Sequence, residues 1–93
     1  MKVSIIGSGT MGIGIAQIAA TMGHDVCVFD NSNEAIKNGE KKLNKILNRL
    51  VEKNKISKKE MNAILEGILF SNNINDISES YLIIEAIIED LKI

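Results

Sequence analysis

Residues 2–12 read KVSIIGSGTMG and join an apolar run directly to a glycine-rich turn. The run 2–6 is short, apolar and partly β-branched, which is typical of a parallel strand buried on both faces. Gly7 permits a tight reversal, Gly9 leaves room for backbone N–H groups to approach an anion, and Gly12 lets a following helix lie close to the strand. The stretch therefore predicts a strand, a phosphate-binding turn and a helix whose N-terminus faces the anion.

The residues that follow the turn distinguish it from a chance spacing of glycines. An apolar helix is expected over residues 13–22, and Gly23 is suited to end it. A second apolar strand, residues 25–29, leads into Asp30, where dinucleotide-binding folds place the carboxylate that holds the adenosine ribose. The strand, the helix and the acid together favour the dinucleotide-binding fold over the alternative, a glycine-rich turn of another α/β protein.

Two consecutive helices are expected after the second strand, where an ordinary crossover has one. Residues 31–34 are a cluster of helix-capping side chains, and the long helix behind them has one apolar face. Ser57 and Glu60 have the spacing of a capping box, which begins a second helix that ends at Gly67. The helix pair spans about residues 33–66 and is an insertion between strands 2 and 3. The apolar face comprises Ile36, Leu43, Ile46, Leu47, Leu50 and Val51.

The last third of the chain supplies two further predicted strands, residues 68–70 and 81–84. Strands that alternate with helices are joined by right-handed parallel crossovers, which gives the strand order 3-2-1-4. The predicted fold class is therefore α/β, the N-terminal part of a doubly wound parallel Rossmann sheet. Because such a sheet normally continues with strands 5 and 6, we expect residues 1–93 to be a dinucleotide-binding domain that is cut off after strand 4.

Basic side chains are concentrated on the helix pair. Residues 37–59 contain nine of the eleven lysines and arginines but only two of the twelve acidic residues. A basic stripe runs along the first helix at steps of three and four residues, and it suits a phosphorylated ligand. A solvated, lysine-rich helix face is the alternative. Nucleic acid is not an expected partner, because aromatic side chains that would stack on bases are scarce. The stripe consists of Lys42, Lys45, Arg49 and Lys53.

Composition limits the other possibilities. The 93 residues suffice for one small domain, and they hold neither a signal peptide nor an apolar stretch long enough to span a membrane. A cytoplasmic protein without a metal site is expected. Cys27, the single cysteine, cannot form an internal disulfide and is expected in the core of the second strand. His24, the only histidine, is expected in a surface turn.

These features together resemble the N-terminal part of the 3-hydroxyacyl-CoA dehydrogenases, in particular the bacterial 3-hydroxybutyryl-CoA dehydrogenases. The resemblance covers all 93 residues. It rests on residues 7–17, GSGTMGIGIAQ, on Asp30, on the lysine-rich helix pair with Lys53-x-Lys55-Ile56-Ser57, and on residues 85–92, EAIIEDLK. The helical insertion and the last motif are not shared by most dinucleotide-binding folds.

The resemblance implies an oxidoreductase of fatty acid and butanoate metabolism, which transfers a hydride between NAD and the C3 carbon of a 3-hydroxyacyl-CoA. It implies that Asp30 binds the NAD ribose and that Glu89 contacts the nicotinamide side of the cofactor. It also implies that Lys53 contacts CoA, with Lys45 and Arg49 as further candidates, since the phosphates of CoA demand cations. The implied pyrophosphate turn comprises Gly7, Ser8, Gly9, Thr10, Met11 and Gly12.

The resemblance also indicates what these residues lack. The catalytic histidine and glutamate of the family come later in the chain, and His24 does not match that histidine. The helical C-terminal domain, which completes the substrate pocket and the dimer, is also absent. The 93 residues alone are therefore not expected to catalyse, and the complete enzyme is expected to be a homo-oligomer. Ile46 stands where some members have a serine that contacts CoA, and it cannot make that hydrogen bond.

Two other functions fit the same turn: a non-catalytic NAD-binding or sensing module, and a dehydrogenase of another hydroxy acid. In each of them NAD is expected in preference to NADP. A carboxylate at Asp30 accepts hydrogen bonds from both ribose hydroxyls but repels a 2′-phosphate. Residues 31–34 supply no cation that could offset this repulsion, and the nearest base is Lys37, one helical turn beyond them.

Overall fold

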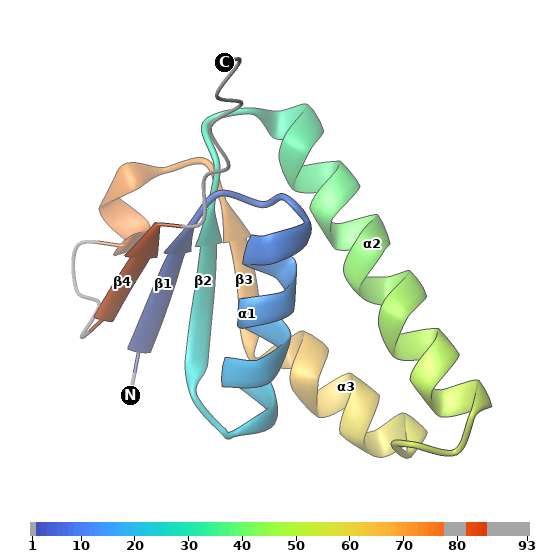
Figure 1. Ribbon diagram of the computed structural model, residues 1–93. Coiled ribbons are helices and arrows are strands. Elements are labelled where there is room, and N and C mark those ends of the chain that lie inside the picture. The colour runs from blue at the N-terminus through green and yellow to red at the C-terminus, as the bar shows by residue number, and fades with distance from the viewer. Residues whose placement is uncertain (1, 78–81, 86–93) are drawn as a thin grey trace, which may run out of the picture.

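The computed structural model describes residues 2–77 and 82–85 (Figure 1). Within these residues the predicted alternation of strands and helices is confirmed. A short 3-10 helix also follows the third strand. The elements are β1 Lys2–Ile6, α1 Thr10–Thr21, β2 Asp25–Phe29, α2 Asn33–Glu52, α3 Lys58–Glu66, β3 Ile68–Ser71, η1 Ile74–Ile77 and β4 Leu82–Glu85.

The four strands form one sheet in the order β3-β2-β1-β4, and every neighbouring pair is parallel. This confirms the predicted strand order and fold class. At the carboxyl end of the sheet, Ile6 of β1 is in register with Phe29 of β2 on one side and with Glu85 of β4 on the other. The residues that follow β1 and β2, Gly7 and Asp30, therefore emerge side by side at one edge.

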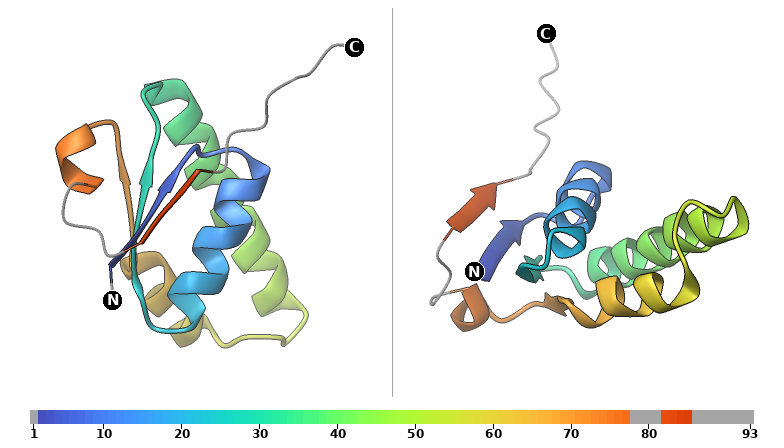
Figure 2. Two further views of the ribbon diagram at one scale, coloured as in Figure 1. Left: turned by 60° about the vertical axis from the view of Figure 1, so that its left-hand side comes forward. Right: turned by 90° about the horizontal axis from the view of Figure 1, so that it is seen from below.

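All three α-helices cover the same face of the sheet, while η1 lies on the opposite face (Figure 2). This arrangement follows from right-handed crossovers, which place α1, α2 and α3 together when the chain moves from β1 to β2 to β3. The core lies between this face and the helices and is aliphatic. It contains Val3, Ile5, Val26, Val28 and Ile68 from the strands, and Ile13, Ala16, Leu43, Leu47, Met61 and Ile64 from the helices.

The ends of the helices follow the predicted capping chemistry. Gly23 has φ of 88° and leads the chain out of α1, a conformation that glycine adopts without strain. Ser32 caps α2 by accepting a hydrogen bond from Ala35 N–H at 3.2 Å. Ser57 and Glu60 form the predicted capping box, in which each side chain accepts from the backbone N–H of the other residue.

Cys27 is buried in β2, as predicted. Burial raises the pKa of its thiol, and the Asp76 carboxylate adds to this effect. Both influences disfavour the thiolate, the form in which cysteine is nucleophilic. Cys27 is therefore a small core residue.

Candidate functional site

The glycine-rich turn between β1 and α1 is built by backbone contacts that only glycine permits. Gly7 has φ of 109°, and its N–H donates to the carbonyl of Phe29 at 2.8 Å. A Cβ atom on Gly12 would lie 2.0 Å from the carbonyl oxygen of Gly7, far inside the van der Waals distance. The first turn of α1 therefore packs directly on the backbone that precedes it, and its N-terminus is held at the carboxyl edge of the sheet.

The N-terminus of α1 presents backbone donors and open space. The first hydrogen bond of the helix runs from Ile13 N–H to the Gly9 carbonyl at 2.9 Å, so the N–H groups of residues 10–12 precede it. Gly9, the N-cap residue, makes no side-chain capping bond, and the first turn holds no acidic residue. A Cβ on Gly9 would meet no described atom within 4 Å. This end of α1 therefore suits an anionic group.

Asp30 lies beside the turn and accepts hydrogen bonds from neighbouring residues. The N–H and the hydroxyl of Ser8 both donate to Oδ2 of Asp30, at 3.2 and 2.9 Å, while Ser32 N–H donates to Oδ1 at 3.0 Å. Burial alone would raise the pKa of Asp30, but hydrogen bonds from Ser32, Ser8 and Asn31 outweigh it and hold the pKa below its ordinary value. Asp30 is therefore an ionised acceptor at neutral pH.

A pocket of about 260 Å³ opens between the ends of β1 and β2, next to Asp30. Ile6 and Phe29 contribute apolar walls, and the Asp30 carboxylate contributes the acceptor. A nucleoside has the same two-sided chemistry, with a flat apolar base and a ribose whose hydroxyls donate hydrogen bonds. The residues present therefore fit the adenosine part of a dinucleotide.

Gly39, in the interior of α2, is a site residue that sequence reasoning missed. A Cβ at this position would lie 3.0 Å from the carbonyl oxygen of Ser8 and 3.2 Å from both Ser8 Cβ and Ile13 Cδ1. Glycine thus lets α2 pack closely on the turn, because a Cβ atom here would force its neighbours to shift. The available signal was a glycine inside a strongly helical segment, which costs about 1 kcal/mol relative to alanine and so indicates a packing requirement.

The basic stripe on α2 lies next to the turn. Lys42, Lys45 and Arg49 line a pocket of about 250 Å³ together with Thr10 of α1 and two isoleucines, Ile13 and Ile46. The Lys42 ammonium donates to the Thr10 hydroxyl at 3.4 Å. The fourth member, Lys53, is the C-cap residue of α2 and lies outside this pocket. The structure thus brings three of the four predicted cations together beside α1.

Three further residues that the sequence singled out have different outcomes. His24 lies in the turn between α1 and β2, at the end of the sheet opposite Asp30, and is partly buried. Met11, at the start of α1, is 54 % exposed and is not among the described contacts of the Asp30 pocket. Glu89 lies outside the described residues.

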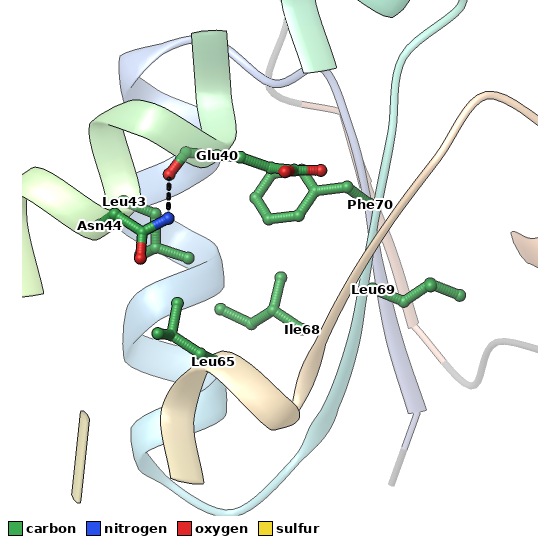
Figure 3. A pocket seen from close by; sticks show the side chains of 7 residues that line it. All are labelled: Glu40, Leu43, Asn44, Leu65, Ile68, Leu69 and Phe70. Atoms are coloured by element: carbon green, nitrogen blue, oxygen red, sulfur yellow. Dashed lines mark hydrogen bonds between the residues drawn. The ribbon is translucent and has the colours of Figure 1, made fainter. Parts of the chain in front are cut away.

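A pocket of about 330 Å³ between α2, α3 and β3 is of a different kind (Figure 3). It carries no basic residue, and its polar groups are Glu40 and Asn44, whose amide donates to the Glu40 carbonyl at 2.9 Å. It therefore does not suit an anionic ligand. Among residues 2–77 and 82–85, no cluster of three metal-binding side chains occurs. No helix in this part of the chain is long and apolar enough to span a membrane.

The family model that matches this chain, over residues 2–93, is the NAD binding domain of 3-hydroxyacyl-CoA dehydrogenase. The chain belongs to this family. The cofactor of this domain is accordingly NAD, as predicted. This finding confirms the resemblance seen in the sequence.

Relatives of known function agree with the family. The chain is 43% identical over 93 residues to a 3-hydroxybutyryl-CoA dehydrogenase of Clostridioides difficile, covering all of this chain and 33% of that protein. It is 35% identical over 91 residues to the 3-hydroxyadipyl-CoA dehydrogenase of Escherichia coli, covering 98% of this chain and 19% of the relative. The chain thus spans about a third or less of the length of these curated relatives.

A solved structure supports the same assignment. The crystal structure of (S)-3-hydroxybutyryl-CoA dehydrogenase PaaH1 from Ralstonia eutropha superposes with a TM-score of 0.90 at 35% identity. The match covers 96% of this chain and 31% of that one. The NAD-binding domain of the family therefore has the sheet and helix arrangement described above.

Proposed function

We propose that this NAD-binding domain serves an enzyme that transfers a hydride between NAD and the C3 carbon of a 3-hydroxyacyl-CoA, of which 3-hydroxybutyryl-CoA is the expected type. The observation that carries the proposal is that two surfaces suited to anions lie side by side, the N-terminus of α1 and the basic pocket on α2. The N-terminus of α1 and the Asp30 pocket suit a dinucleotide, and the basic pocket of α2 adjoins them through the contact between Lys42 and Thr10. Relatives named 3-hydroxybutyryl-CoA dehydrogenase support this substrate class.

In this proposal the glycine-rich turn and Asp30 bind different parts of NAD. The backbone of the turn residues binds the pyrophosphate, and Asp30 accepts hydrogen bonds from the adenosine ribose. Glu89 is assigned to the nicotinamide side on the family resemblance. NAD, when bound, would accept the hydride, and the residues of this domain would hold NAD in place. The turn residues are Gly7, Ser8, Gly9, Thr10, Met11 and Gly12.

We further propose that the basic stripe binds the phosphates of the acyl-CoA. The stripe begins beside Thr10 and runs from Lys42 to Lys53, a distance of about 16 Å at 1.5 Å per helical residue. An extended ligand with several phosphates suits such a row of cations better than a single small anion does. The CoA contacts are assigned to Lys53, Lys45 and Arg49.

Replacing Lys53 with alanine in the complete enzyme is expected to weaken acyl-CoA binding severalfold and to leave NAD affinity unchanged. One exposed cation contributes up to about 1 kcal/mol to binding a phosphate in water. Titration of both ligands measures the effect, and Lys41→Ala is the matched control, since Lys41 is an exposed lysine of α2 that does not belong to the basic stripe. A loss of NAD affinity in the Lys53 variant would mean that the stripe faces the dinucleotide instead.

We propose that residues 1–93 alone bind NAD without catalysing the reaction. His24, the only histidine in the sequence, lies at the end of the sheet away from Asp30 and cannot act as a base near the cofactor. In a spectrophotometric assay with 3-hydroxybutyryl-CoA and NAD, no absorbance of NADH is expected, although calorimetry detects NAD binding. Turnover by the 93 residues would contradict this proposal, and an absence of NAD binding would contradict the assignment of the site.

We also propose that the complete enzyme is a cytoplasmic homo-oligomer. The single buried cysteine suits a reducing compartment. Two large apolar side chains, that of Ile18 on α1 and that of its C-cap residue Met22, are 64 % and 72 % exposed, which suits a surface that other parts of an assembly cover. Sedimentation velocity of the complete enzyme is expected to show more than one subunit, and a monomer at micromolar concentration would contradict this.

A further inference from the structure

Ser8 connects the glycine-rich turn to the acid at the end of β2. We propose that Ser8 is a positioning residue, whose buried hydroxyl fixes the Asp30 carboxylate in the orientation that accepts the ribose hydroxyls of NAD. This inference rests on the proposed role of Asp30 as the ribose-binding acid. It gives Ser8 a part different from that of residues 10–12, whose backbone N–H groups are proposed to bind the pyrophosphate.

The hydrogen bonds around Asp30 carry the argument. Ser8 donates twice to Oδ2, through its N–H at 3.2 Å and its hydroxyl at 2.9 Å, while Ser32 N–H donates once to Oδ1 at 3.0 Å. Donors on both oxygens define the plane of the carboxylate. The protein therefore orients Asp30 before NAD arrives, and the ordering cost at binding is reduced.

The packing of α2 sets the direction of the Ser8 side chain. Ser8 is 3 % exposed, and a Cβ atom on Gly39 would lie only 3.2 Å from Ser8 Cβ. The side chain is thus enclosed between the turn and α2 and does not reach solvent, where the pyrophosphate would lie. Its hydroxyl donates a hydrogen bond to the Asp30 carboxylate.

The same hydrogen bonds determine the titration of the acid. Those from Ser32 and Ser8 favour the ionised carboxylate and help to hold the pKa of Asp30 below its ordinary value. Loss of the Ser8 hydroxyl removes one of them, so the pKa of Asp30 rises. NAD binding needs the ionised form as acceptor and is lost as the pH falls through this pKa. In a protein without the hydroxyl, that loss therefore begins at a higher pH.

The test is calorimetric titration of the protein and its Ser8→Ala variant with NAD from neutral pH downward. We expect the variant to bind NAD about tenfold more weakly at neutral pH, the effect of one hydrogen bond to a charged group. We also expect its affinity to fall at a higher pH than that of the unmodified protein. Ser4→Ala is the matched control, because it removes a hydroxyl that is also buried but lies away from Asp30. Ser4 is paired with Cys27 of β2, and Cys27 precedes Asp30 by three residues. The affinity and pH profile of this control should match those of the unmodified protein.

Two results would overturn the inference. One is a Ser8→Ala variant that binds NAD as tightly as the unmodified protein, or more tightly, with the same pH profile. The other is an Asp30 carboxyl pKa, followed by NMR without NAD, that does not rise in this variant or, should it fail to fold, in Ser8→Gly. Failure of the unmodified protein to bind NAD would instead contradict the proposed function, so the two failures are distinguishable.

Discussion

Replacing Gly12 with alanine is expected to weaken NAD binding by more than a hundredfold and to destabilise the domain by about 3 kcal/mol. The new Cβ would lie 2.0 Å from the Gly7 carbonyl oxygen, and that oxygen belongs to backbone that cannot rotate away. Relief requires α1 to move off the turn, and forced overpacking of this kind costs about 1–3 kcal/mol or more. The displaced helix no longer presents its N-terminal N–H groups to the pyrophosphate.

Urea unfolding and calorimetric titration with NAD measure the two effects. Gly14→Ala is a closely matched control, because Gly14 lies in the same helix and an added Cβ there meets no described atom within 4 Å. In that variant the gain in helix propensity should stabilise the domain by about 1 kcal/mol. A Gly12 variant with unchanged stability and NAD affinity would show that α1 does not pack on Gly7 as described.

Replacing Asp30 with alanine is expected to weaken NAD binding and to narrow the difference in affinity between NAD and NADP. In the unmodified protein the ionised Asp30 carboxylate would lie within a few ångströms of a 2′-phosphate. Two unit charges about 4 Å apart repel by about 4 kcal/mol at an effective dielectric constant of about 20, and screening reduces this to a preference for NAD of about ten- to a thousandfold. The variant lacks both the hydrogen-bond acceptor and this repulsion.

Titration of each protein with both nucleotides gives the four affinities needed. Asp25→Ala is the matched control: it removes the same charge from the other end of β2, where the side chain is exposed. Its affinities for both nucleotides should be those of the unmodified protein. Equal affinities for NAD and NADP in the unmodified protein would show that Asp30 does not face the ribose.

The sequence by itself determined the elements of the domain and their order, because short-range chemistry decides both. The apolar run before Gly7 predicts β1, and the serine caps at Ser32 and Ser57 predict the starts of α2 and α3. The right-handed crossover rule then places β4 beside β1. These signals span at most one turn or one crossover, so a single sequence suffices to recognise them. The family resemblance added the cofactor, which the family match confirms.

Only the tertiary structure shows which residues of the candidate site are in contact with one another. The hydroxyl of Ser8 bonds Asp30 across 22 positions of the chain, and Lys42 reaches Thr10 across 32 positions. Gly39 permits both contacts by letting α2 lie on the turn. Periodicity predicts that α2 is a helix with an apolar face, but the rotation and closeness with which it packs depend on the side chains of α1 and the turn. For that reason the sequence indicated a basic stripe, whereas only the fold shows that Lys42, Lys45 and Arg49 lie together beside Thr10 of α1.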